Sequence, residues 1–298
     1  MAGISFSKTQ VLFFSKKTMS DPLISVLMTS YNREKYIGEA IESVLGSTYK
    51  NFELIISDDC SKDKTVEIAH SYAIKDSRVK IHVNEKNLGD YPNRNKAAGY
   101  AIGKYIKYVD ADDYIYPRGL QILAEMMEQF PEAGWGLCSL IQIKEQPYPI
   151  FLPANKIYEY NYFRSSIFQK APLSAIIKKS VFEQEGGFAP MKMVGDFEMW
   201  NRLALKHPVL LMPDGIVWYR EHGEQEVKNY RDYILQYESI RFNYLKNASC
   251  SLSKEKVNSL LKGFRKNAFK QMIFSFLKNN WKIGGDQFKI WWFYFTKS

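Results

Sequence analysis

Residues 24–65 read ISVLMTSYNREKYIGEAIESVLGSTYKNFELIISDDCSKDKT, and this stretch decides the fold. Two β-rich apolar runs, at 24–29 and 52–57, flank apolar residues at helical spacing that stop at Gly46. A strand, a helix and a second strand in this order indicate a parallel pair joined by a crossover helix. Polar residues follow each strand, TSYN after the first and DD after the second. The stretch therefore predicts a βαβ unit with a polar edge.

The same alternation continues to about residue 130. We expect strands at 79–83 and 104–109, and helices at 65–72, 93–102 and from Pro117 to about Phe130. This pattern predicts an α/β fold with a Rossmann-like, mainly parallel central sheet and flanking helices. Ligands bind such sheets at the carboxyl ends of the strands. Polar clusters occur at those ends, in Thr29–Asn32, Asp58–Asp59, Asn84–Asn87 and Asp110–Asp113.

The second half of the chain is less regular. A region of short strands and a Pro-rich loop at 135–180 precedes a helix at 196–206 and a short strand at 216–220. From about Glu224 we expect helix to the end of the chain, with breaks near 248–253 and at Gly284-Gly285. We therefore predict one domain over 21–223, divided near residue 130, and a C-terminal helical extension over 224–298.

Composition places the chain among globular proteins, because it is 46% hydrophobic and 24% charged. Its three cysteines are widely spaced without a CxxC, which favours a reducing compartment. No apolar run reaches the roughly 18–20 residues of a membrane-spanning helix. In residues 1–20, the apolar run VLFF is too short for a signal peptide. We expect a cytoplasmic protein whose first 20 residues are a poorly ordered extension, or whose translation begins at Met19.

The net charge of +9 lies almost entirely in the C-terminal region. Residues 251–298 hold ten Lys or Arg and two acids, a net charge of +8, so the first 250 residues carry 9 − 8 = +1. Between Lys262 and Phe295 these basic residues alternate with many aromatic ones, which is typical of amphipathic helices at an anionic membrane surface. We expect peripheral association with the inner face of the cell membrane. The alternative is packing on the main domain; nucleic-acid binding is disfavoured by the nearly neutral remainder.

Three carboxylates follow the predicted strand at 104–109, in the sequence YVDADDY. In an extended chain Asp110 and Asp112 point the same way, so both could reach one divalent cation. The alternative is a solvated turn in which Asp113 caps the next helix. Asp59, at the end of an earlier strand, could accept hydrogen bonds from the edge of a nucleobase, or could serve turn and cap geometry only.

These motifs, in this order, resemble the family 2 glycosyltransferases with the GT-A fold. Members of that family pair a strand ending in T-x-Y-N with one ending in D-D-x-S-x-D-x-T, followed by N-L-G and VDADD-like motifs, as this chain does. In the second half, GGF at 186–188 and GDFEMWNRL at 195–203 resemble the acceptor-side block of the family. The chain departs from the family pattern at Gly195, where many members carry Glu.

The resemblance implies an inverting, metal-dependent transfer of a sugar from a nucleotide sugar, with UDP favoured, to a hydroxyl of a glycan or lipid-linked acceptor. The donor would bind before residue 130 and the acceptor after it. Nucleotide contacts are implied for Thr29, Tyr31, Asp59, Arg94 and Asp110. Ligands of Mn²⁺ or Mg²⁺ are implied for Asp112, with Asp110 and with His222 of the WYREH element.

Asp196 matches the catalytic base of the family, and Glu198 is the nearby competitor for that role. A helix cap is the structural alternative for Asp196. A sugar-nucleotide pyrophosphorylase is disfavoured, because TSYNRE stands where that class carries a Gly-rich basic loop. The remaining alternative is a non-catalytic nucleotide- or glycan-binding relative of the same fold.

Overall fold

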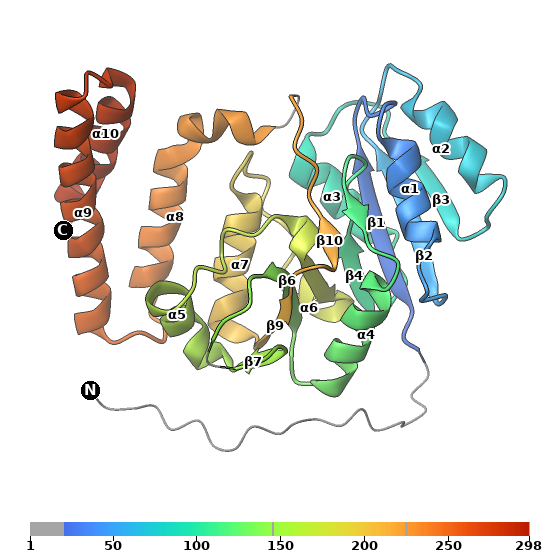
Figure 1. Cartoon of the computed structure of the whole chain (residues 1–298), viewed down its shortest axis with the longest axis horizontal. Coiled ribbons are helices and arrows are strands. Elements are labelled where there is room, and N and C mark those ends of the chain that lie inside the picture. The colour runs from blue at the N-terminus through green and yellow to red at the C-terminus, as the bar shows by residue number, and fades with distance from the viewer. Residues whose placement is uncertain (1–20, 145, 224–225, 298) are drawn as a thin grey trace.

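An eight-stranded sheet forms the centre of the molecule, shown in Figure 1 as a computed structural model that describes residues 21–144, 146–223 and 226–297. The strand order is β3-β2-β1-β4-β8-β6-β9-β7. The strands are β1 (Ile24–Ser30), β2 (Phe52–Asp58), β3 (Val79–Val83), β4 (Tyr105–Tyr108), β6 (Trp135–Leu140), β7 (Ile150–Leu152), β8 (Ala175–Lys178) and β9 (Val209–Pro213). A small second sheet pairs β5 (Tyr114–Ile115) with β10 (Val217–Trp218) in antiparallel orientation.

Helices cover both faces of the sheet (Figure 1). They are α1 (Ile37–Leu45), α2 (Thr65–Ala73), α3 (Asp90–Gly99), α4 (Gly119–Gln129), α5 (Ala154–Phe163), α6 (Lys179–Gln184), α7 (Gly195–Lys206), α8 (Ile234–Lys246), α9 (Lys254–Leu277) and α10 (Trp281–Lys297). Short 3₁₀ helices occupy Pro172–Ser174 and Glu226–Tyr233.

The first four strands form the parallel half of the sheet, as the sequence predicts. β3, β2, β1 and β4 pair in parallel, whereas β8 joins β4 and β6 in antiparallel orientation. β1 is apolar on both faces, because Val26 and Met28 belong to one hydrophobic core and Leu27 to the other. Burial on both faces explains why β1 reads as a continuous apolar run. The strands of this half therefore end at one common edge, which we call the carboxyl edge.

The C-terminal helices are divided between two cores. Side chains of α8 and of the beginning of α9, such as Ile240, Leu245 and Val257, belong to the core of the main domain. Beyond them, Ala268, Ile290 and Tyr294 form a separate small core of α9 and α10, against which Ile234 and Phe242 of α8 pack. The extension expected over 224–298 is therefore joined to the main domain through α8, which contacts both cores.

The prediction of a helix break at Gly284-Gly285 is wrong. The chain reverses at residues 278–280, where Asn279 has a φ of 55°, and α10 runs through both glycines. A Cβ at Gly284 would lie 2.3 Å from the ring of Phe276, so this glycine permits close approach of α9 and α10. Residues 1–20, for which we predicted a poorly ordered extension, lie outside the described residues. Within the described residues, none of the helices combines the length and the apolar character needed to cross a membrane.

Candidate active site

Asp110 lies just beyond β4 and pairs with Arg94 of α3. Nη1 and Nη2 of Arg94 donate to the two carboxylate oxygens of Asp110 at 2.6 and 2.8 Å, and Nε donates to Asp90 at 2.7 Å. Thr29, in β1, donates to Asp110 at 3.0 Å. The two neighbouring carboxylates keep the pKa of buried Arg94 well above its ordinary value. The structure thus brings Thr29, Arg94 and Asp110 together, with the guanidinium of Arg94 directed at Asp110.

Asp112 lies next to two nitrogen groups from distant parts of the chain. Its Oδ2 accepts from Nε of Arg33 at 2.8 Å and lies 2.9 Å from Nε2 of His222. Its other oxygen, Oδ1, accepts no hydrogen bond from the described residues. All three side chains are largely buried, with exposed fractions of 22% for Arg33, 14% for Asp112 and 7% for His222. Sequence patterns place Asp112 and His222 at this site but give no indication of Arg33.

A divalent cation fits Asp112 and His222 better than it fits Asp110. Asp112 presents one oxygen outside its hydrogen bonds, and an imidazole beside a carboxylate suits Mn²⁺. Both oxygens of Asp110 are held by Arg94. Across the described residues, no three His, Cys, Asp or Glu side chains are grouped so as to hold a metal ion. A cation here would therefore share its coordination with substrate phosphates and water, as Mg²⁺ commonly does.

The segment that carries His222 is fastened across the end of β4 by Arg220. The amide of Arg220 donates to Asp113 at 3.0 Å, its Nε donates to the carbonyl of Asp112 at 2.9 Å, and Nη2 donates to Glu39 at 2.5 Å. The ring of Tyr36 lies 5.2 Å from the Arg220 guanidinium and 4.9 Å from the His222 ring. These contacts place His222 beside Asp112 although 110 residues separate them in sequence.

The alternative in which Asp113 caps the next helix is wrong. α4 begins only at Gly119, and Asp113 instead receives the Arg220 amide while almost fully buried. Burial and the neighbouring carboxylates of Asp110 and Asp112 raise the pKa of Asp113 to about 8. Asp113 therefore has a structural role, which is to position the segment that carries His222.

Asp59 joins the ends of β2 and β3. Its carboxylate accepts from the amides of Leu88 and Gly89 at 2.8 and 2.9 Å and from the side chain of Asn84 at 2.8 Å. Gly89 has a φ of 87°, a backbone conformation that favours glycine, directly before α3. Asp59 is 3% exposed, and these hydrogen bonds hold the loop before α3. The predicted contact with a nucleobase stays a prediction.

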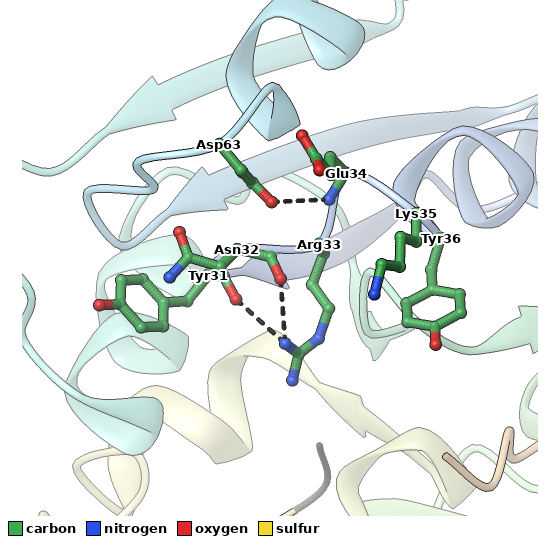
Figure 2. Close-up of a pocket in the computed structure, with 7 residues that line it drawn as sticks. All are labelled: Tyr31, Asn32, Arg33, Glu34, Lys35, Tyr36 and Asp63. Atoms are coloured by element: carbon green, nitrogen blue, oxygen red, sulfur yellow. Dashed lines mark hydrogen bonds between the residues drawn. The ribbon is translucent and has the colours of Figure 1, made fainter. Parts of the chain in front are cut away.

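A cavity of about 520 Å³ borders this site along the loop that follows β1. Figure 2 shows its lining: Tyr31 extends to one side, Lys35 and Tyr36 lie on the other, and Arg33 reaches between them. Nη1 of Arg33 donates to the carbonyls of Tyr31 and Asn32, both at 3.2 Å. Tyr31 is 44% exposed, so its ring is open to a planar ligand such as a base.

Asp196 lies in the first turn of α7, against α3. Burial raises the pKa of its carboxyl to about 6, although hydrogen bonds from the Phe197 amide, at 2.6 Å, and from Tyr91 oppose the rise. Nearby Asp90 raises the pKa further, and Arg94 lowers it. The candidate base and the Arg94–Asp110 pair therefore share one electrostatic environment. The side chain also keeps part of its surface exposed.

The position of the Tyr91 ring explains why glycine fits at position 195, where many members of the family carry Glu. A Cβ at this position would lie 2.7 Å from the ring of Tyr91, which is 4% exposed and packs against the start of α7. A Glu at position 195 would require the Tyr91 ring to move. The glycine therefore allows Tyr91 to lie beside Asp196.

Glu198 has a different environment from Asp196. Both of its oxygens are bonded to Arg202 at 2.9 Å, and the hydroxyl of Tyr244 in α8 donates to it at 2.5 Å. Arg202 in turn donates to the carbonyls of Glu185 and Gly187, in the GGF turn. Glu198 thus ties α7 to α8 and to that turn, which favours Asp196 over its competitor as the base.

Comparisons with known proteins identify similar sequences and similar folds. An Escherichia coli protein named UDP-Glc:alpha-D-GlcNAc-diphosphoundecaprenol beta-1,3-glucosyltransferase WfgD is 40% identical over 109 residues, which is 37% of this chain and 42% of WfgD. The structure of Staphylococcus aureus TarS 1-349 with UDP-GlcNAc matches with a TM-score of 0.64 and 21% identity, over 90% of this chain and 81% of that one. The mannosyltransferase PcManGT of Pyrobaculum calidifontis, with GDP-Man and Mn²⁺, matches with a TM-score of 0.57 and 18% identity, over 74% and 63%.

Alignments with the curated relatives span between 19% and 67% of the length of those proteins. The two solved structures, at this level of identity, establish the GT-A fold of the chain. The sequence model of the family described as Glycosyl transferase family 2 matches residues 25–186, more than half of the chain. This match covers both the carboxyl-edge motifs and the start of the GGF turn. The chain therefore belongs to glycosyl transferase family 2.

Proposed function

We propose that the protein transfers a sugar from a nucleotide-sugar donor, a UDP-sugar in the first place, to a hydroxyl group of a glycan or lipid-linked acceptor, with inversion at the anomeric carbon. One observation carries this proposal. A carboxyl with a pKa raised to about 6, Asp196, shares an electrostatic environment with the Arg94–Asp110 pair at the carboxyl edge. A base poised near neutral pH at the carboxyl edge of the sheet, where ligands bind in this class of fold, is what this reaction requires.

In the proposed step, Asp196 accepts the proton of the acceptor hydroxyl. The oxygen then forms a bond to the anomeric carbon while the bond from that carbon to the diphosphate oxygen breaks, and the nucleoside diphosphate leaves with the bonding electron pair. Because its pKa is about 6, the Asp196 carboxyl is mostly ionised above about pH 6 and can accept this proton. Tyr31 is the candidate for stacking on the base, and Thr29 with Arg94 fixes Asp110 beside the donor.

Asp112 and His222 are the residues that would hold Mn²⁺ or Mg²⁺. Such a cation neutralises the charge of the departing diphosphate. Arg33 places a second positive charge at the same carboxylate, and Arg220 holds the His222 segment in place. Support for the cation comes from the fit of the two side chains and from the structurally similar PcManGT, which was solved with GDP-Man and Mn²⁺. Asp110 contributes to this site by positioning, as the partner of Arg94.

We place the reaction at the inner face of the cell membrane, in the synthesis of a surface polysaccharide. WfgD acts, by its name, on a sugar linked to diphosphoundecaprenol, which is a membrane lipid carrier. An acceptor of this class would bring the enzyme to a membrane surface, in keeping with the basic C-terminal helices.

A donor screen tests the proposal. Binding and nucleotide release are measured for UDP-, GDP- and dTDP-sugars, with Mn²⁺, with Mg²⁺ and with chelator. We expect metal-dependent binding and release for one nucleotide class, lost in Asp112→Asn and kept in the control Asp214→Asn, which lies on the exposed surface. Failure of every donor to bind with either metal would overturn the proposal. Metal-dependent binding without release in the presence of lipid-linked acceptors would instead favour the non-catalytic alternative.

A further inference from the structure

The α9–α10 hairpin exposes an unusual number of large apolar side chains. Eight of them are at least 41% exposed: Phe269, Ile273, Phe274, Leu277, Trp281, Phe288, Trp292 and Phe295. Leu277 and Trp281, on either side of the reversal between the helices, are 79% and 69% exposed. We call these eight residues the hairpin surface. A contiguous exposed apolar patch of this kind marks an interaction site.

The two helices contribute to one continuous surface rather than to two. Phe269 of α9 lies 5.8 Å from Trp291 of α10, measured between ring centroids, and Trp291 contacts Phe288, Trp292 and Phe295 at 5.3–6.1 Å. At the tip, Phe276 lies 5.2 Å from Trp281. Beneath this layer Ala268, Ile290 and Tyr294 form the core of the hairpin. The exposed rings are therefore held by packing from below and are not side chains of a loosely placed helix.

Lysines flank the hairpin surface. Lys262 and Lys266 precede Phe269 and Ile273 at intervals of three, seven and eleven residues, so all four lie on one face of α9. Lys278 and Lys282 stand at the tip, and Lys289 follows Phe288 on α10. All five lysines are exposed. An apolar surface with a cationic rim is complementary to a bilayer that carries anionic lipid headgroups.

We propose that the hairpin surface docks on an anionic membrane surface, with the aromatic rings at the level of the headgroups and the lysines on the phosphates. A second copy of the chain fits this surface less well. Residues 251–298 carry a net charge of +8, so two hairpins facing each other would bring like charges together. Aromatic residues are also the side chains enriched where a protein meets a membrane interface.

The tip of the hairpin and the carboxyl edge lie at the same end of the molecule. The tip of the hairpin lies at the top of Figure 1, on the side where β1 ends and where α7 begins with Asp196 in its first turn. The inference extends the membrane location proposed above, and it does not depend on the identity of the donor sugar.

Vesicle flotation of the full-length protein tests the docking. Vesicles of phosphatidylcholine alone are compared with vesicles that contain about 30% phosphatidylglycerol, at about 0.05 and 0.5 M salt. We expect binding to the anionic vesicles only, at least tenfold weaker at high salt. Trp281→Ser with Trp292→Ser, and separately Lys262→Glu with Lys266→Glu, should each lower the partition coefficient at least tenfold. Both pairs are exposed, so folding, checked by thermal melting, should persist.

Two matched controls use exposed residues outside the hairpin. Ile74→Ser with Ile141→Ser removes apolar side chains that are 87% and 80% exposed, and Lys75→Glu with Lys144→Glu repeats the charge reversal. Both controls should bind vesicles as the wild type does. Equal binding by hairpin variants and controls would overturn the inference. So would concentration-dependent dimerisation that the tryptophan variant abolishes while vesicle binding is absent.

The outcome is separable from that of the donor screen. Hairpin variants should keep metal-dependent donor binding in the absence of vesicles, because the hairpin surface lies outside the carboxyl edge. Loss of vesicle binding with intact donor binding would identify the hairpin as a docking element. Absence of donor binding in a wild-type protein that still floats with anionic vesicles would contradict the proposed function alone.

Discussion

The carboxyl edge of the sheet and the α9–α10 hairpin both concentrate charged side chains, but their surroundings differ. At the edge, ion pairs join residues far apart in sequence, such as Arg33 with Asp112 and Arg94 with Asp110, and the partners are mostly buried. On the hairpin, lysines point to solvent, and the pair Lys289–Asp286, at 3.7 Å, is local. Burial makes each charge at the edge dependent on its neighbours, whereas water screens those of the hairpin.

This difference has a functional consequence. A buried network fixes side-chain positions and shifts pKa values, as catalysis requires, at the cost of sensitivity to substitution. An exposed basic surface has little internal structure to lose, and its charges act on whatever approaches from outside. We therefore expect substitutions at the edge to change chemistry and folding, and substitutions of the exposed residues of the hairpin surface to change association only.

The largest effect should come from Asp196→Asn. The amide cannot accept the acceptor proton, so we expect kcat to fall about 10²–10⁴-fold, the usual contribution of a general base. The wild-type rate should fall below about pH 6 as Asp196 becomes protonated, and the variant should lack this limb of the profile. Steady-state kinetics from about pH 5 to 8 measures both. A variant that keeps its turnover, with Glu198→Gln inactive although folded, would show that the roles of the two carboxylates are reversed.

Asp113→Asn should remove a pH dependence of the free energy of unfolding that comes from the buried Asp113 carboxyl. The folded pKa of Asp113, about 8, is above the unfolded one, so the folded state binds the extra proton between about pH 4 and 8. Stability should therefore fall as pH rises through this range. The variant should lose this dependence and exceed the wild type by a few kcal/mol at about pH 8. Urea unfolding at about pH 5 and 8 measures the difference; identical slopes of stability against pH would contradict it.

Sequence patterns predict elements that depend on local residues. The bounds of β1, β2 and β3 and the end of α1 agree with expectation within a residue, because apolar periodicity and Gly46 are local signals. α3 begins at Asp90 rather than Asn93, since Gly89 and the carboxylate of Asp59 fix its start. The carboxyl-edge position of Asp110 and Asp112 follows from the same parallel topology.

The unpredicted features arise from contacts across the chain. The hydrogen bond from Arg33 to Asp112 joins residues 79 apart in sequence, and that from Arg220 to Asp113 joins residues 107 apart. No sequence pattern predicts either contact. Gly284-Gly285 reads as a helix break, yet it is the approach of the Phe276 ring from another helix that requires Gly284. Packing between distant parts of the chain determines these features and overrides the preferences of the local sequence.

The same substitution at two glycines compares the two regions directly. At Gly195 a new Cβ would lie 2.7 Å from the Tyr91 ring, so Gly195→Ala should destabilise the fold by about 1–3 kcal/mol and lower kcat by displacing Tyr91 from Asp196. At Gly263, in α9, a new Cβ meets open space, and Gly263→Ala should stabilise by about 0.5–1 kcal/mol through helix propensity. Thermal melts and donor kinetics of both variants test the contrast. Equal effects of the two substitutions on stability and on kcat would contradict the contrast between the two regions.

The smallest effect we expect is that of Arg33→Gln on cation affinity. Nε of Arg33 donates to Oδ2 of Asp112 at 2.8 Å, so its charge opposes a second positive charge there. Its removal should tighten Mn²⁺ binding by about fivefold, equivalent to about 1 kcal/mol for one charge at a partly exposed site. Titration of Mn²⁺ followed by electron paramagnetic resonance measures this without turnover, and the exposed Lys75→Gln serves as control. Weaker Mn²⁺ binding in Arg33→Gln would mean that Arg33 orients Asp112 for the cation instead of competing with it.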